Sequence, residues 1–483
     1  MFHCSDHISI ILLLTLKGGL RMDIHENYIS PYSWRYGSPE MRQIWGEANK
    51  RRLWRLVWVT LAEVQAEYGL LSAEQVADLR EHVDQVDIPR ALEIEAHIHH
   101  DLMAELKTFA EASPLGGAAL HLGATSADIQ DNADALRLHQ SLVLVLDRLR
   151  STLISFAEAI QNWAEQPVMG FTHLQPAEPT TLGYRLAFYA QDILMDWEDL
   201  TRVRRMLRGK GFKGAVGTGA SYAELVGEAN LADFETRLST KIGLPFFPVT
   251  TQTYSRKQDY RILGALAGLA SSLYKFAFDL RLLQSPSIGE LSEPFGGKQV
   301  GSSAMPFKRN PINAEKIDSL ARALAQLPRL AWDNAAHSAL ERTLDDSANR
   351  RSALPESFLI ADELINTTRR IVDGLEVNES AMARNLSLYG PFAGTERVLM
   401  ALSKTGADRQ VMHERLRKLS MTAWESIQSG ERNPLVDLVC QEPVFLEYLS
   451  KEELSELLDA SHHLGDAPER ARQLSETIQQ AVA

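Results

Sequence analysis

The chain has 483 residues, of which 45% are hydrophobic and 23% charged, as expected of a globular protein. It carries 50 basic and 63 acidic side chains, and the net charge of −13 argues against a nucleic-acid partner held by general electrostatic attraction. Only Cys4 and Cys440 are present, which excludes a disulfide framework and favours a reducing cytosol. We therefore expect a cytoplasmic protein.

The first apolar stretch is ISIILLLTL, residues 8–16. It is shorter than a membrane span and lacks the basic flank and small-residue cleavage site of a targeting signal, so we expect no membrane association. The sequence from Met22, MDIHENYISPYSWRY, has the character of a protein start. Residues 1–21 are expected to be an extension outside the fold.

Long helices dominate the middle of the chain. Apolar residues recur at steps of three and four over residues 129–163, which predicts one helix of roughly 38 residues, about 57 Å long. Similar series predict helices over 182–207 and 262–283. Two more helices are expected near Pro311 and near Ser352, the former kinked at Pro328.

These patterns predict an all-α protein with three helical domains. Residues 22–124 form an N-terminal helical domain, 125–378 a central bundle of long helices, and 379–483 a C-terminal helical domain. Helices this long exceed what a compact monomer needs, so their extra apolar surface is expected to be buried against other copies of the chain.

The segment HIHHD, residues 97–101, places His97 and Asp101 on one face of an expected helix. This spacing is compatible with a metal site, but HExxH is absent and no Cys lies nearby, so we expect no metal. Histidines beside a carboxylate more often transfer protons or bind anions.

The segment HLGATSADIQDN, residues 121–132, opens the longest helix. Thr125 and Ser126 therefore stand where the helix dipole is positive, which suits either an anion or plain helix capping, and the two are not exclusive.

The segment GFTHLQPAEPTTLG, residues 170–183, places His173 in a loop before the second long helix. Such a histidine is either an ordinary surface residue or a general acid. The following GKGFKG, residues 209–214, matches a dinucleotide-binding pattern by letter only, because it follows a helix instead of a strand.

Two polar segments lie in the second half of the chain. GSSAMPFKRNP, residues 301–311, puts Ser302 and Ser303 on a loop, with Asn310 and Pro311 expected as helix cap and first helical residue. ERTLDDSANRR, residues 341–351, is either a self-paired charged turn or a set of arginines that grip carboxylate or phosphate oxygens.

Together these segments resemble the fumarase/aspartase superfamily, and most closely its adenylosuccinate lyase branch. GSSAMPFKRNP is similar to the lyase signature, and SWRYGSPEM, HLGATS, GFTHLQPAEPTTLG, QTYSRK and ERTLDDSANRR match in the expected order over residues 30–420. The resemblance implies a homotetramer with a shared helical bundle, active sites built from three subunits, and no cofactor. It implies β-elimination of fumarate from adenylosuccinate, giving AMP, and from SAICAR, giving AICAR.

The resemblance also implies roles for individual residues. Ser302 matches the base that removes the C–H proton, and His173 the acid that protonates the departing nitrogen. The matching substrate-binding residues are Arg35, Tyr36, His99, His100, Asp101, Thr125, Ser126, Gln252, Lys308, Asn310, Lys316, Arg342, Ser347 and Arg351.

Three positions depart from the pattern of close relatives. His99 and Lys316 stand where arginine is common, and Phe307 stands where tyrosine or histidine is common. These departures leave open the preference between the two substrates. A sister lyase, such as one for argininosuccinate, and a non-catalytic bundle of the same fold remain alternatives.

Overall fold

The computed structural model describes residues 28–297, 301 and 304–483, and the chain divides into two compact units between Tyr36 and Gly37. In the first unit a short 3-10 helix, Pro31–Ser33, begins after Ser30, whose Oγ accepts from the Tyr32 N–H. The predicted extension, residues 1–21, and its apolar stretch lie outside the described residues.

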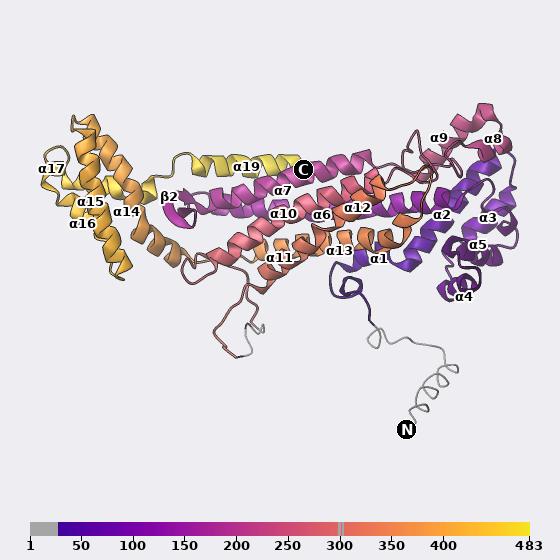
Figure 1. Ribbon diagram of the computed structural model, residues 1–483, viewed down its shortest axis with the longest axis horizontal. Coiled ribbons are helices and arrows are strands. Elements are labelled where there is room, and N and C mark those ends of the chain that lie inside the picture. The colour runs from indigo at the N-terminus through magenta and orange to yellow at the C-terminus, as the bar shows by residue number, and fades with distance from the viewer. Residues whose placement is uncertain (1–27, 298–300, 302–303) are drawn as a thin grey trace, which may run out of the picture. The chain divides into compact units, whose positions relative to one another are not determined.

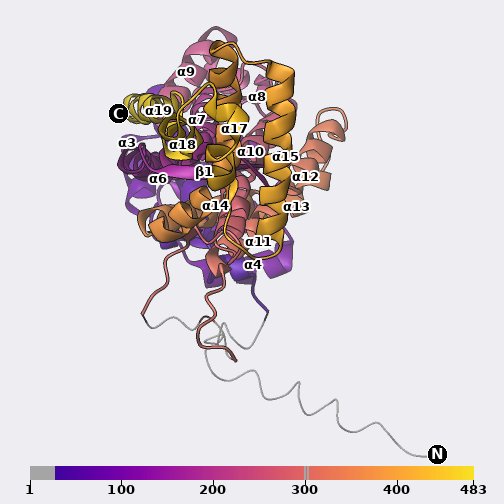
Figure 2. The same ribbon diagram turned by 90° about the vertical axis from the view of Figure 1, so that its left-hand side faces the viewer.

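Long helices form the centre of the second unit, where they run alongside one another (Figure 1) and are seen end-on in Figure 2. Packing joins α6 to α7 and α13, and α10 to α7, α11, α12 and α13. The helices are α6 Ser126–Asn162, α7 Leu182–Met206, α10 Lys257–Leu283, α11 Ile312–Leu324, α12 Leu327–Ala336 and α13 Asp345–Asp373.

The sequence periodicity explains these helices. On α6 the residues Leu138, Leu142, Leu149, Leu153 and Phe156 recur at steps of three, four or seven, and all are fully buried. The helix has 37 residues, so the single long helix predicted here is confirmed. The all-α fold class is confirmed with it.

Shorter helices cover one end of the bundle. Their core contains Trp54, Trp58 and Phe109, and it is completed by Tyr222 and Phe234 from the segment between α7 and α10. The helices are α1 Pro39–Trp45, α2 Glu47–Glu67, α3 Ala73–Glu81, α4 Ile88–Ile98, α5 Asp101–Ala112, α8 Ala220–Val226 and α9 Leu231–Ile242, with 3-10 turns Gly117–Ala119 and Glu228–Asn230.

The C-terminal helices have a core of their own around Leu402, Leu435 and Phe445. The last helix then returns to the bundle, where the Ser475 hydroxyl donates to the Ala157 carbonyl of α6 over 2.9 Å. The helices are α14 Glu379–Lys404, α15 Arg409–Gln428, α16 Leu435–Cys440, α17 Pro443–Leu446, α18 Lys451–Leu458 and α19 Ala467–Val482, with a 3-10 turn Ala460–His462.

Two small antiparallel pairs accompany the helices. A hairpin of β1 Pro167–Thr172 and β2 Gln175–Thr181 joins α6 to α7, and β3 Leu291–Ser292 pairs with β4 Glu376–Val377. The hairpin was not expected, because its proline- and threonine-rich sequence reads as a loop.

Two helix boundaries differ from expectation. The helix predicted near Ser352 begins at Asp345, and Pro328 starts a new helix, α12, instead of kinking a continuous one, since proline is favoured in a first turn. The predicted domain limits at residues 124 and 378 stay a prediction. No helix in the described part of the chain is long and apolar enough to span a membrane.

Candidate functional site

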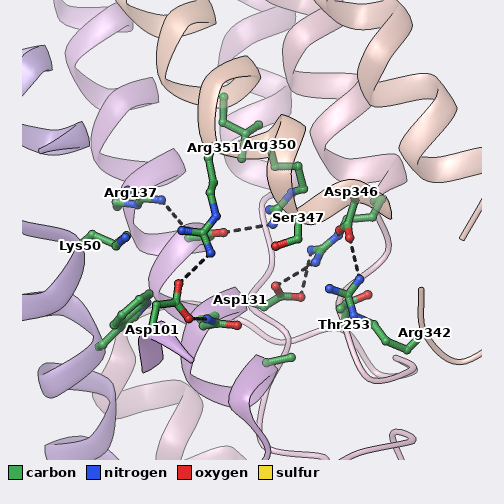
Figure 3. Close-up of a pocket in the computed structure, with 16 residues that line it drawn as sticks. Lys50, Asp101, Asp131, Arg137, Thr253, Arg342, Asp346, Ser347, Arg350 and Arg351 are labelled. Carbon is green, nitrogen blue, oxygen red and sulfur yellow. Dashed lines mark hydrogen bonds and ion pairs between the residues drawn. The ribbon is translucent and has the colours of Figure 1, made fainter. Parts of the chain in front are cut away.

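A polar cavity lies where α2, α6 and α13 meet, and charged side chains from all three helices line it (Figure 3). Of the predicted site residues, Asp101, Arg342, Ser347 and Arg351 line this cavity. Its volume, about 90 Å³, is below that of a pocket that encloses a nucleotide-sized ligand. In a single chain this cavity therefore holds part of a ligand at most.

A buried ion-pair network holds the wall of the cavity together. Arg256 binds both carboxylate oxygens of Asp131 over 3.0 and 3.1 Å and Asp346 over 2.6 Å. Burial raises the pKa of the Asp346 carboxyl, but the charge of Arg256 and its neighbours lowers it overall, so this group is ionised. The pairs fix the first turn of α13 against α6 and α10.

In the segment 341–351, residues from Asp345 onward are helical, and Arg342 pairs with Asp346 inside the segment over 2.7 Å. Its arginines have different roles. Arg350 donates to Asp259 and to the Tyr254 hydroxyl, each over 2.8 Å, and belongs to the buried network. Arg351 and Arg342 are the more exposed members, with side chains 58% and 23% accessible.

Asp101 joins the N-terminal helices to α13. Its carboxylate accepts from Arg351 Nη2 over 2.8 Å and from Gln130 Nε2 over 3.3 Å. Burial raises the pKa of Asp101, but the hydrogen bond and charge of Arg351 lower it overall. Asp101 is therefore a fixed negative charge that orients the Arg351 guanidinium.

The HIHHD segment is broken between two helices, so His97 and Asp101 do not share a helical face as predicted. α4 ends at Ile98, His99 adopts a left-handed conformation with φ 54°, and His100 caps α5. His100 Nδ1 accepts from the Met103 N–H over 3.4 Å, and its Nε2 lies 3.5 Å from Ser126 Oγ. Among the described residues, no group of three His, Cys, Asp or Glu side chains could hold a metal ion.

The start of α6 is held by a carboxylate that the sequence did not single out. Asp128 is fully buried and accepts from the Lys210 ammonium, from the backbone N–H groups of Thr125 and Gly214, and from the Tyr222 hydroxyl. Thr125 is the N-cap residue of α6, as the capping alternative predicted. A buried Asp–Lys pair separated by 82 residues leaves no local signal in the sequence.

His173 lies in the two-residue turn of the hairpin. His173 and Leu174 have φ values of 55° and 59°, so both adopt the left-handed conformation. Two-residue hairpin turns favour this conformation because it matches the right-handed twist of the strands, but it is unusual in a turn without glycine. Arg185, Lys275 and Asp279 line a cavity with the exposed histidine. The turn thus places His173 beside α7 and α10, in a strained backbone of the kind that clusters at functional positions.

Gly301 and residues 304–311 belong to a loop whose Arg309 lies at the same end of α10 as His173, since Gln284 Nε2 donates to the Arg309 carbonyl over 3.0 Å. Asn310 donates to the Gly301 carbonyl over 3.0 Å, and Pro311, not Asn310, is the cap of α11. A Cβ on Gly301 would collide with the Lys308 carbonyl, which explains the glycine. Ser302 and Ser303 lie outside the described residues.

The N-terminus of α11 is occupied by a carboxylate of the protein itself. The N–H groups of Asn313 and Ala314 donate to the buried Glu293 carboxylate over 3.0 and 2.9 Å. The Lys316 ammonium likewise forms an ion pair within the protein, with Glu363 over 2.7 Å. Lys308, the other lysine predicted to bind substrate in this segment, is exposed on the loop before α11.

The remaining predicted residues lie in two places. Arg35 and Tyr36 belong to the first unit, where the Arg35 guanidinium lies 5.8 Å from the Trp34 ring and 6.0 Å from the Tyr36 ring. Gln252 lies beside the 341–351 segment, since its N–H donates to the Glu341 carbonyl over 3.1 Å.

The predicted site residues of the second unit thus form two groups at opposite ends of the bundle. Arg256, which precedes α10, lines the first cavity, and Leu283, which ends α10, lines the cavity of His173. The 27 residues of α10 place these ends about 40 Å apart. The first group contains His99, His100, Asp101, Thr125, Ser126, Gln252, Arg342, Ser347 and Arg351, and the second His173, Lys308, Asn310 and Lys316.

Two family models match this chain. One, described as "Lyase", matches residues 35–325, and the other, described as "Adenylosuccinate lyase C-terminus", matches residues 391–474. The adenylosuccinate lyase of Saccharomyces cerevisiae is 37% identical over 457 residues, which cover 93% of this chain and 94% of that protein. The adenylosuccinate lyase of Schistosoma mansoni is 40% identical over 456 residues, with the same coverage.

Solved structures share the fold. The 3-carboxy-cis,cis-muconate lactonizing enzyme from Pseudomonas putida superposes with a TM-score of 0.83 and 25% identity, covering 94% of this chain and 99% of that one. A fumarate lyase from Mesorhizobium sp. BNC1 superposes with a TM-score of 0.80 and 23% identity, covering 93% and 99%. These matches confirm the predicted fumarase/aspartase-like fold.

Proposed function

The chain belongs to the adenylosuccinate lyase family and is a carbon–nitrogen lyase, and we propose that it releases fumarate from adenylosuccinate and from SAICAR. The observation that carries the proposal is the identity of 37% and 40% with two adenylosuccinate lyases over nearly the whole chain. The products are AMP and AICAR, so the enzyme serves purine nucleotide synthesis, and we place it in the cytosol.

The elimination needs a base for a weakly acidic C–H, stabilisation of the carbanion that results, and an acid for the departing nitrogen. We assign Ser302 as the base and His173 as the acid. A serine hydroxyl is a weak base until its pKa is lowered, and the ammonium of Lys308 supplies positive charge six residues away on the same loop. Because Glu293 occupies the α11 N-terminus, this charge, not the helix dipole, stabilises the anionic intermediate.

We assign substrate-binding roles to each of the two groups of residues in turn. Arg342, Ser347 and Arg351 supply donors for the phosphate and nucleotide, with Arg35 and Tyr36 from the N-terminal segment. His99, His100 and Asp101 lie beside the start of α6, where Thr125 and Ser126, with Gln252, bind the succinyl carboxylates. Lys308, Asn310 and Lys316 approach from the other group, with Lys316 held by Glu363.

The separation of the two groups supports a site shared between copies. His100 with Ser126 and His173 cannot meet in one chain, because about 40 Å of α10 separates the two ends. We propose a homotetramer in which three subunits contribute to each site. Exposed apolar side chains on α7 and α10, including Phe188, Met195 and Phe278, are available for contacts between copies.

The test is direct assay of fumarate release and of the loss of adenylosuccinate absorbance after mixing enzyme with substrate. Turnover of adenylosuccinate, but not argininosuccinate, is expected, and absence of any turnover by a folded protein would refute the proposal. The comparisons do not favour a sister lyase or a non-catalytic bundle.

A further inference from the structure

The cavity between α2, α6 and α13 carries an excess of positive charge. Six cationic and four carboxylate side chains line it, in a chain whose net charge is −13. A local excess of this kind attracts an anionic group. The cationic residues are Lys50, Arg137, Arg256, Arg342, Arg350 and Arg351.

Two of these cations are not available to a ligand. Arg256 binds Asp131 and Asp346, and Arg350 binds Asp259, all through side chains at most 10% exposed. Turning either arginine toward a ligand would leave buried carboxylates without a counter-charge, which is strongly unfavourable. These residues form the wall of the cavity.

Lys50 differs from them because its partner is outside the cavity. Its ammonium lies 2.7 Å from Glu47 Oε2, three residues earlier on α2, and the Glu47 side chain is 43% exposed. Ion pairs between neighbouring turns of one helix add only a few tenths of a kcal/mol, and Glu47 would keep its second partner, Arg51, 2.9 Å away. A doubly charged anion can therefore replace Glu47 at small cost.

The surroundings of Lys50 direct its charge into the cavity. The ammonium lies 4.9 Å from the centroid of the Trp54 ring, which also lines the cavity, and the side chain is only 15% exposed. Burial raises the pKa of Asp101, and the Lys50 charge helps to lower it, after the larger effects of Arg351 and of the Leu102 N–H. Figure 3 shows Lys50 beside Asp101 and Arg351.

We propose that Lys50 binds the phosphate group of the nucleotide, together with Arg351 and Ser347 of α13. This inference rests on the proposed function, because it names a further residue of the same site. A phosphate monoester dianion needs more than one cation, and Lys50 adds a point charge from α2 opposite the planar fork of Arg351.

The test compares inhibition by the two products, since AMP carries the phosphate and fumarate does not. Lys50→Met is expected to raise the Ki of AMP about 10- to 100-fold, the loss of one hydrogen bond to a charged group. The KM of adenylosuccinate rises with it, while kcat and the Ki of fumarate change less than about twofold. Lys50→Arg keeps the charge and retains most of the AMP affinity.

Two further variants make the test specific. Arg52→Met removes a cation of the same helix that pairs with Asp84 outside the cavity, and both Ki values are expected to stay unchanged. Glu47→Gln frees Lys50 and is expected to tighten AMP binding by about twofold, the worth of such a pair. An equal rise of both Ki values in Lys50→Met, or no rise for AMP, would overturn the inference. A wild-type protein without turnover would instead refute the proposed function.

Discussion

The buried pair of Asp128 and Lys210 gives the sharpest prediction about stability. Both side chains are fully buried, and Asp128 also accepts from three backbone N–H groups and a tyrosine hydroxyl. Asp128→Asn keeps one side-chain oxygen but removes the negative charge, so the Lys210 ammonium stays buried beside neutral oxygens such as the Gly214 carbonyl, 3.2 Å away. An uncompensated buried charge costs about 3–5 kcal/mol.

This cost can be converted to a shift in Tm. An unfolding entropy of about 2.1 cal/mol/K per residue gives about 1 kcal/mol/K for a chain of this length, so Asp128→Asn is expected to lower Tm by about 3–5 °C. Thermal unfolding followed by circular dichroism, at one fixed protein concentration, measures the shift. The double variant Asp128→Asn/Lys210→Met removes both charges and is expected to recover at least half of the loss.

Asp233→Asn provides a matched control, because Asp233 forms an exposed pair with Arg237, and no measurable shift in Tm is expected. A Tm for Asp128→Asn within about 1 °C of wild type would refute the reasoning. So would a double variant that is no more stable than the single one.

Two further predictions concern catalysis and pH. His173→Ala and Ser302→Ala are each expected to lower kcat by at least about 10²-fold without loss of the tetramer, and near-normal rates from both would remove the assigned roles. Burial on α7, helped by the charges of Asp192 and Asp199, raises the pKa of Asp196 to about 7. Between pH 4 and 7 the folded state therefore keeps a proton that the unfolded state loses, so stability falls as pH rises. Asp196→Asn should have the higher Tm at pH 8 and an equal Tm at pH 4, and equal Tm values at both would contradict this account.

Most of the fold could be predicted from the sequence, because long helices carry a regular apolar period. The series that ends at Trp163 predicted α6 to within a few residues. The periodicity carried no information on the hairpin, since Pro176 and Pro179 are poor strand residues and the turn at His173 has no glycine. The backbone there is held by its surroundings, not by local preference.

The site could be predicted as a set of segments but not as an arrangement. Local patterns located His100, Ser126 and Arg351, which the structure brings to one end of the bundle. The contacts that hold them depend on pairs far apart in the chain, such as Asp128 with Lys210 and Asp131 with Arg256, and a single sequence does not encode such pairs locally. The contact of Glu293 with the first N–H groups of α11 could not be predicted for the same reason.

Mixing two inactive variants tests the central claim, a lyase site completed by other copies of the chain. His100→Ala and His173→Ala alter residues at opposite ends of the bundle, and each variant alone is expected to be nearly inactive. After the two are mixed under conditions that exchange subunits, random assembly gives about one site in four with both histidines, so about a quarter of wild-type fumarate release is expected. Activity no greater than that of the separate variants, in tetramers shown to have exchanged subunits, would contradict the shared site.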